Sequence, residues 1–228
     1  CSQTDTWSLD KPHSTYLAMI AIGEFTRVKE IKDNLELGYL ADISNTILIK
    51  EIFKHTTEMI DHFESLLKFP FPWSKYDQIV VKDFVTGAME NTSASVFMED
   101  VLYNQLLYNE TADDIISHEL FHQWFGDLVT CESWANLPLN ESFATYGEYM
   151  WYEYKYGRDE ADYHLLQDIN AYLAEAEREA HALIRYFHHS PDEMFDSHSY
   201  SKGALVLHML RNYVGDEAFF KSLEYFFD

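Results

Sequence analysis

The sequence predicts an α+β fold in which a small sheet-containing half precedes a helical half. First, residues 14–25 and 77–84 contain apolar runs with the length of buried strands. Second, from Thr111 onward apolar residues recur at helical spacing in segments that end at glycines. Third, 47% of the 228 residues are apolar, enough for a substantial core in one large domain or in a domain plus part of another.

Each element of the first half has a local signal. Residues 45–69 have the apolar spacing of a helix, which is expected to stop at Pro70 and Pro72. Residues 87–100 follow the second strand, open on a glycine and contain a short strand at 93–97.

The second half is predicted to be a series of helices. The first, residues 111–126, has Thr111 as a candidate N-cap and Gly126 as its stop. The others are expected at residues 139–157, 158–187, 199–215 and 216–227.

Composition excludes several classes of partner. The formal charge of −23 argues against nucleic acid and anionic membrane surfaces, since both require basic patches. Cys1 and Cys131 are too few for a disulfide framework and match no cysteine metal motif. We expect no membrane span and no signal peptide in this sequence. The sequence does not indicate the cellular compartment of the protein. Because it begins at a cysteine and stops at Asp228 inside a helical pattern, we expect a fragment of a longer protein.

The stretch HELFHQWFGDLVT, residues 118–130, carries the strongest chemical signal. Positions i and i+4 share a helix face, so His118 and His122 can both reach one metal ion. Glu119 then lies beside the ion, where it can accept a proton from a water on the metal. Alone, the motif remains a hypothesis, because a chain with eleven histidines can match it by chance.

A catalytic zinc needs a third protein ligand, and Glu141 is the candidate. Two histidines and a glutamate are a known ligand set. Eighteen residues separate His122 from Glu141, enough for the first helix to end and a second helix to return. The alternative is an ordinary acid in a first helical turn, where the helix dipole favours it.

Four separated motifs then occur in order: GAMEN at 87–91, HELFHQWFGDLVT at 118–130, NESFA at 140–144 and YSKG at 200–203. In this order and spacing they resemble the M1 family of zinc aminopeptidases, from about Trp7 to the last residue. One departure is Ser142, which stands where the family often has glycine.

The resemblance implies a thermolysin-like zincin catalytic domain, a gluzincin, with a small mixed sheet lobe and a helical lobe. This domain would occupy residues 25–228 and be truncated at its C-terminal end, and residues 1–24 would be the last strand of a preceding β-domain. One Zn²⁺ per chain would be held by His118, His122 and Glu141. The implied activity is removal of N-terminal amino acids from peptides that have a free N-terminus.

The resemblance also implies two catalytic roles. Glu119 would be the general base for the water that attacks the first peptide bond. Tyr200 would stabilise the developing oxyanion opposite the metal.

The GAMEN motif would bind substrate. Glu90 would pair with the α-amine of the peptide, which explains release of one residue at a time. Gly87 and Ala88 would line the peptide in the manner of a strand, and Met89 and Asn91 are expected at the same surface.

Two acids are predicted to lie behind the ligands. Glu148 is two turns after Glu141 on the same face and could orient a zinc histidine, although a surface salt bridge explains it nearly as well. Asp127, directly after Gly126, is the second candidate for a residue that contacts a metal ligand without binding the metal itself.

Two other functions stay open: a bifunctional epoxide hydrolase and aminopeptidase, and a non-catalytic peptide-binding protein on the same fold. The sequence Gly-Ala-Met-Glu-Asn, rather than Gly-Gly-Met-Glu-Asn, favours a plain aminopeptidase over the first. The three predicted metal ligands, Glu119, Glu90 and Tyr200 are all present, which argues against a non-catalytic peptide-binding protein. The preferred N-terminal residue, the oligomeric state and the activity of the fragment by itself are not predicted.

Overall fold

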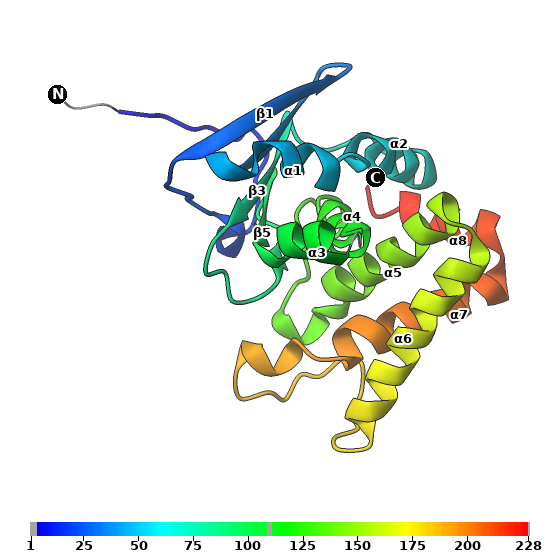
Figure 1. Ribbon diagram of the computed structural model, residues 1–228. Helices are drawn as coiled ribbons and strands as arrows, with labels where there is room; N and C mark the ends of the chain where they lie inside the picture. The colour runs from blue at the N-terminus through cyan, green and yellow to red at the C-terminus, as the bar shows by residue number, and fades with distance from the viewer. Residues whose placement is uncertain (1–3, 109–110, 228) are drawn as a thin grey trace.

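The computed structural model describes residues 4–108 and 111–227; Cys1 and Asp228 lie outside the described residues. Its sheet and helices confirm the predicted α+β class (Figure 1). The strands are β1 Phe25–Lys32, β2 Leu35–Asp42, β3 Lys75–Val81, β4 Ala88–Met89 and β5 Ala94–Met98. The helices are α1 Thr46–Ile52, α2 Thr56–Leu67, α3 Asp100–Tyr108, α4 Asp113–Phe121, α5 Pro138–Lys155, α6 Arg158–Ala176, α7 Gly203–Val214 and α8 Asp216–Glu224.

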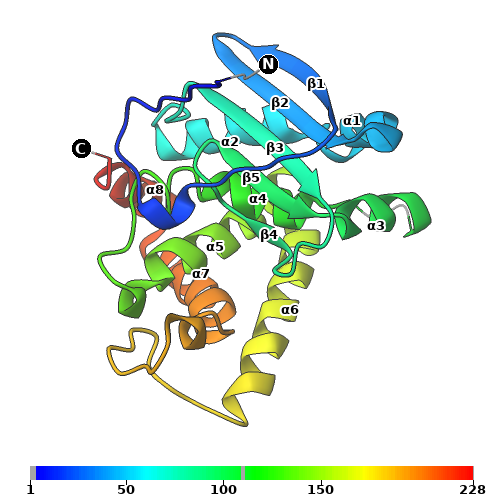
Figure 2. The ribbon, with the colours of Figure 1, turned by 90° about the vertical axis from the view of Figure 1, so that its left-hand side faces the viewer.

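The sheet has the order β1-β2-β3-β5-β4 and is mixed. β1 and β2 form an antiparallel hairpin, β2, β3 and β5 are parallel, and β4 runs antiparallel to β5. The inner strands β3 and β5 have buried or partly buried residues throughout, as expected for strands covered on both faces. The short strand β4 is last in the strand order and so forms an edge of the sheet. Figure 2 shows it on the side of α4 and α5.

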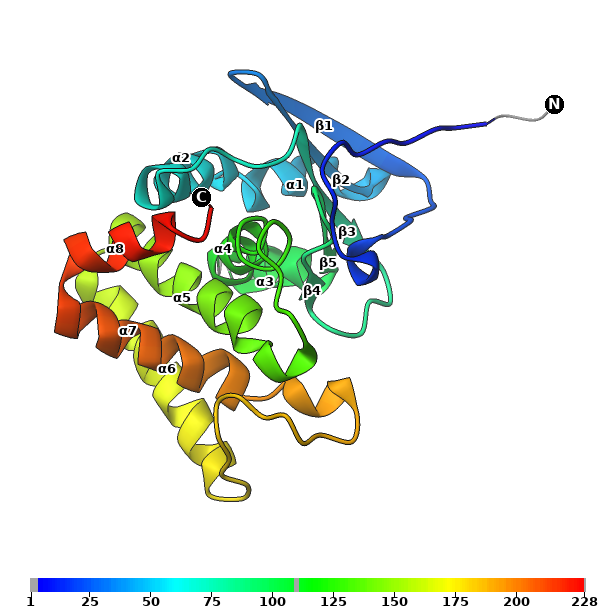
Figure 3. The ribbon, with the colours of Figure 1, turned by 180° about the vertical axis from the view of Figure 1, so that it is seen from behind.

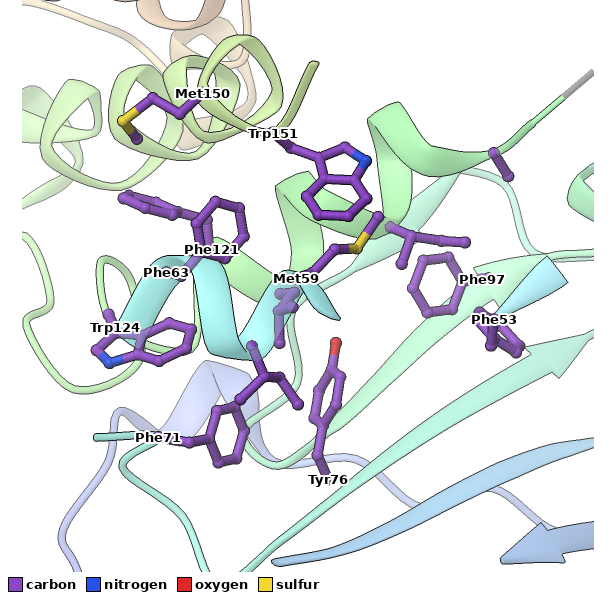
Figure 4. Packing of buried hydrophobic residues seen from close by; sticks show 14 of the residues in the cluster. Phe53, Met59, Phe63, Phe71, Tyr76, Phe97, Phe121, Trp124, Met150 and Trp151 are labelled. Carbon is purple, nitrogen blue, oxygen red and sulfur yellow. The ribbon is translucent and has the colours of Figure 1, made fainter. Parts of the chain in front are cut away.

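Aromatic side chains fix the end of α4 against α2 (Figure 4). Phe63 of α2 packs edge-on against Phe121 of α4, with ring centroids 5.0 Å apart. Phe71 packs in the same way against Trp124 at 5.3 Å. Edge-to-face pairs of this kind stabilise beyond the area they bury, by about 0.5–1.5 kcal/mol each.

Helix α5 packs between α4 and α7, as Figure 3 shows from behind. Gly147 permits a close approach, because a Cβ atom there would lie 2.7 Å from Cγ of Phe121 on α4. The other end of α4 is also tied to α5, because the carboxylate of Asp113 accepts hydrogen bonds from Trp151 (2.9 Å) and Tyr156 (2.6 Å). The two helices that carry the predicted ligands are thus held together at both ends.

The strand predicted at residues 14–25 is wrong. Thr15–Leu17 is a 3₁₀ turn, and the rest of the segment before Phe25 has no regular structure. The carbonyl of Leu17 accepts a hydrogen bond from the Asn91 side chain (3.1 Å) instead of a strand partner, and Ile20 is 85% exposed. The described residues before Phe25 therefore contain no strand.

The helix predicted at residues 45–69 is two helices, α1 and α2. Between them Phe53 stacks on Tyr39 at 5.5 Å, which turns the chain toward the sheet. Thr56 then donates a hydrogen bond to the buried Gln78 (2.7 Å). As predicted, the second helix ends before Pro70.

The helix predicted at residues 158–187 ends early, at Ala176. Beyond it, His181 contacts Asp196 at 2.9 Å and Arg185 lies 3.7 Å from the same carboxylate. These tertiary contacts override a helical sequence pattern. No helix in the described part of the chain is both long and apolar enough to cross a bilayer.

Candidate metal centre and cleft

Helix α4 presents both motif histidines on one face. The regular helix ends at Phe121, and the N–H of His122 continues the turn by donating to the carbonyl of His118 (3.1 Å). At the other end, the N-cap residue is Ala112 rather than the predicted Thr111. The hydroxyl of Thr111 still accepts a hydrogen bond from the N–H of Asp113 (3.2 Å).

Three donor atoms converge between α4 and α5. The Nε2 atoms of His118 and His122 are 3.0 Å apart, and Oε2 of Glu141 lies 3.3 Å from the first and 3.2 Å from the second. All three residues are buried, with 8%, 1% and 3% of their surface exposed. Glu141 lies in the first turn of α5, which begins at Pro138.

These separations fit a tetrahedral divalent ion. Zinc binds nitrogen and carboxylate oxygen at about 2.0–2.2 Å, so neighbouring tetrahedral ligands are about 3.3–3.5 Å apart. Without a cation, two imidazoles and a carboxylate at this distance need a shared proton, and Glu141 raises the pKa of His122 to about 9 despite its burial. The donor set and its spacing therefore suit zinc.

The far nitrogens of both imidazoles are held by acceptors. Nδ1 of His118 donates to the Glu148 carboxylate (2.7 Å), and Nδ1 of His122 donates to the carbonyl of Phe125 (2.9 Å). Both bonds leave the Nε2 lone pairs free to face the ion, as metal-binding histidines require. The other oxygen of Glu148 contacts His164 (2.8 Å), so Glu148 joins two histidines in a partly buried network rather than forming a surface salt bridge.

Gly126 closes the turn that follows His122. Its φ of +138° is a conformation that other residues rarely adopt. A Cβ atom there would lie 2.8 Å from Nδ1 of His122. Glycine is thus required both by the backbone and by the closeness of the ligand ring.

Acids crowd the space around the three donors. Burial raises the pKa of Glu119 to about 8, and one of its carboxylate oxygens has no hydrogen-bond partner among the described residues. Burial also raises the pKa of Glu90 above its usual range. Asp127 is buried nearby, and burial with the charges of Glu90 and Glu119 raises its pKa strongly.

Asp127 contacts the segment of the histidine ligands through its backbone rather than through its side chain. Its N–H donates to the carbonyl of His122 (3.0 Å), so its backbone helps to close the turn. Its carboxylate has no hydrogen-bond partner among the residues that the structure describes. Asp127 therefore does not orient a ligand imidazole through its side chain.

Tyr200 reaches the centre from a separate turn. It lies in the single π-helical turn His198–Lys202 that precedes α7. Its ring is parallel to that of His118, with centroids 5.9 Å apart. Burial, followed by the nearby carboxylates, raises its pKa far above 10, so the hydroxyl keeps its proton.

A cleft of about 740 Å³ opens over the three donors. Ala88 and Met89 of β4 line it, together with Glu90, Glu119 and Tyr200. Because β4 is the sheet edge, its outer side is not paired with another strand of the described chain.

Two residues of the GAMEN motif, Gly87 and Asn91, are not among the described residues that line the cleft. Gly87 forms the turn before β4 with φ of +75°, and its carbonyl accepts a hydrogen bond from the N–H of Met98. Asn91 holds the carbonyl of Leu17 and so fixes the N-terminal segment. Both shape the cleft indirectly.

Sequence reasoning missed an aromatic group on the cleft wall. Tyr16 packs on Trp134 at 5.2 Å, and Trp134 packs on Phe195 at 6.0 Å. The Tyr16 hydroxyl accepts a hydrogen bond from Asn140 (3.1 Å) and donates to Glu90 (3.5 Å). These residues are far apart in the sequence and share no periodic pattern, so no local signal pointed to them.

Comparison with known proteins relates the chain to a peptidase family. Residues 52–228 match the family model described as "Peptidase family M1 domain". The chain is 33% identical to "Probable aminopeptidase 1" of Sulfurisphaera tokodaii, over 90% of this chain and 27% of that protein. It is 33% identical to "Aminopeptidase M1" of Arabidopsis thaliana, over 92% of this chain and 25% of that protein.

A mammalian relative is similarly close. The chain is 34% identical to "Glutamyl aminopeptidase" of Bos taurus, over 94% of this chain and 23% of that protein. The chain thus spans about a quarter of the length of the curated relatives that it matches. The family match and these identities together show that the chain belongs to peptidase family M1.

Proposed function

We propose that this chain is the catalytic core of a zinc-dependent aminopeptidase that removes N-terminal residues from peptides. The observation that carries the proposal is the convergence of two Nε2 atoms and one carboxylate oxygen within 3.3 Å of one another. Family membership and relatives named as aminopeptidases support it. We propose further that residues 25–228 form a thermolysin-like zincin domain and that residues 1–24 end a preceding domain.

Zinc would be held by His118, His122 and Glu141 and, when bound, would lower the pKa of a water and polarise the substrate carbonyl. Glu119 accepts the proton of the attacking water and passes it to the departing amine. Burial raises its pKa above that of an exposed glutamate, which makes it a stronger base toward the proton of a water. The Glu119 oxygen that has no hydrogen-bond partner among the described residues leaves a lone pair available for this transfer.

Glu90 and β4 restrict attack to the first peptide bond. The peptide adds to β4 as a further strand, beside Ala88 and Met89. Its α-ammonium pairs with Glu90, whose burial makes a charge-assisted bond strong and an unpaired charge costly. Only a free N-terminus satisfies Glu90 while the first peptide bond lies over the metal.

Tyr200 donates its proton in a hydrogen bond to the oxygen on which negative charge develops. Its high pKa keeps the donor protonated, and its ring is held parallel to His118. A preorganised donor of this kind supplies about 3 kcal/mol to the transition state.

The test uses the protein that carries this chain and an aminoacyl p-nitroanilide. We expect Glu119→Gln to keep zinc at the candidate metal centre and to lose about 10²–10⁴-fold in kcat, the usual contribution of a general base. Glu160→Gln, an exposed acid on α6, is the matched control and should retain full activity. Zinc-independent hydrolysis, or equal cleavage of an N-acetylated substrate, would refute the proposal.

A further inference from the structure

A buried serine joins the two elements that carry Glu141 and Tyr200. Ser142 directly follows Glu141 on α5 and is 2% exposed. Its hydroxyl donates a hydrogen bond to the carbonyl of Ser199 (2.6 Å). Ser199 belongs to the π-helical turn and directly precedes Tyr200. One buried bond therefore links the helix of a candidate metal ligand to the turn of the candidate oxyanion donor.

The peptide group between Ser199 and Tyr200 is held at both of its polar ends. Its carbonyl accepts from Ser142, and its N–H donates to the carbonyl of Asp196 (3.1 Å). The N–H of Ser199 in turn donates to the Asp196 carboxylate (2.9 Å). Because a peptide group is planar, these bonds fix its orientation and so the direction in which the Tyr200 side chain leaves the backbone.

Ser142 also packs closely against the start of α7. Gly203 begins that helix directly after the π-helical turn, and a Cβ atom there would lie 1.7 Å from Oγ of Ser142 and 2.4 Å from its Cβ. The next nearest atom would be a methyl of Leu183, at an ordinary contact distance of 3.5 Å. Ser142 is thus the side chain for which position 203 must leave room, and this close approach brings its hydroxyl within reach of the turn.

We propose that Ser142 is a positioning residue, whose hydrogen bond to the turn holds the Tyr200 hydroxyl in register with a metal bound by Glu141. This inference rests on the proposed function, in which Tyr200 donates to the developing oxyanion. The tyrosine hydroxyl lies at the end of a long side chain, so a small rotation of the backbone moves it by a larger distance. Misplacement of a reacting group by about 1 Å can lower a rate by about 10²-fold.

Steady-state kinetics of the protein that carries this chain, with an aminoacyl p-nitroanilide, test the role. Ser142→Ala should lower kcat about 10-fold, between the loss of one hydrogen bond and a misplacement of 1 Å. KM and zinc content should stay unchanged, because Glu90 and the metal ligands keep their contacts. Ser117→Ala is the matched control: Ser117 is also buried beside a ligand, but its hydroxyl donates within its own helix, to the carbonyl of Asp114 (2.9 Å), so kcat should not change.

A double-variant cycle with Tyr200→Phe separates positioning from a general loss of structure. If Ser142 acts through the Tyr200 hydroxyl, Ser142→Ala should have no further effect on kcat once that hydroxyl is gone. A partly unfolded enzyme would lose the same factor in both backgrounds. That result, or full kcat in Ser142→Ala, would overturn the proposal. Full kcat in Tyr200→Phe would refute the oxyanion role in the proposed function, and this inference with it.

An exchange of packing covers the case in which Ser142→Ala does not fold. Gly203→Ala should lower the Tm, because the new methyl meets Ser142, and the double variant Ser142→Gly with Gly203→Ala should recover it. The double variant still lacks the hydroxyl, so its kcat should stay about 10-fold below that of the wild type. Recovery of full kcat together with the Tm would mean that packing rather than the hydrogen bond positions the turn, and would overturn the proposal.

Discussion

Replacing Gly126 by alanine tests how the turn after α4 positions a ligand. The backbone there has φ of +138°, and the new Cβ atom would lie 2.8 Å from Nδ1 of His122. Because Nδ1 is held at 2.9 Å from the carbonyl of Phe125, the ring cannot move away without weakening that bond. The substitution should therefore strain the fold and misdirect the metal-binding nitrogen at once.

The two effects have separate magnitudes. A non-glycine residue in a sparsely populated backbone region costs about 1–3 kcal/mol of unfolding free energy. Loss of the bond that orients a metal-binding histidine typically lowers metal affinity by about 10–100-fold. That loss corresponds to about 1.4–2.8 kcal/mol of binding free energy.

Gly157→Ala is the matched control. Its φ is +94°, so alanine meets comparable backbone strain, but nothing lies within 4 Å of the new Cβ atom. Competition with a zinc chelator should show weaker binding for Gly126→Ala only, while denaturant unfolding of the metal-free proteins shows both destabilised. Equal zinc affinity in the two variants would refute the role given to the turn.

Three further variants probe the cleft. Glu148→Gln keeps an acceptor for His118 but removes the charge, so zinc affinity in a chelator competition should fall about tenfold; unchanged affinity would contradict the orienting role. Tyr200→Phe should keep its zinc and KM while kcat falls about 10²–10³-fold, and a change in KM alone would exclude transition-state stabilisation. Glu90→Gln should lower kcat/KM for free-amine substrates by about 10–100-fold, the value of a charge-assisted hydrogen bond, with zinc content as its control; a loss of zinc instead would make Glu90 a structural residue.

The motif on α4 could be predicted because its geometry is local. The spacing of His118 and His122 places both rings on one helix face whatever the rest of the chain does. The position of Glu141 could be predicted only in outline, since it depends on how closely α5 packs on α4. Gly147 sets that approach, and its role appears only when Phe121 is seen beside it.

The elements that were predicted incorrectly depend on distant contacts. Residues 14–25 have the apolar pattern of a strand, but Tyr16 packs on Trp134 and the carbonyl of Leu17 accepts from Asn91. The segment after Ala176 has a helical pattern that its contacts with the π-helical turn override. Pairings of this kind leave no periodic trace in the sequence, which is why Tyr16 was missed as part of the cleft.

Anomalous diffraction at the zinc edge, from crystals loaded with one equivalent of Zn²⁺, tests the central claim most directly. We expect the strongest peak within about 2.0–2.2 Å of Nε2 of His118, Nε2 of His122 and a carboxylate oxygen of Glu141. A crystal with no peak there, or with Glu141 turned away from a zinc held by the histidines alone, would contradict the account.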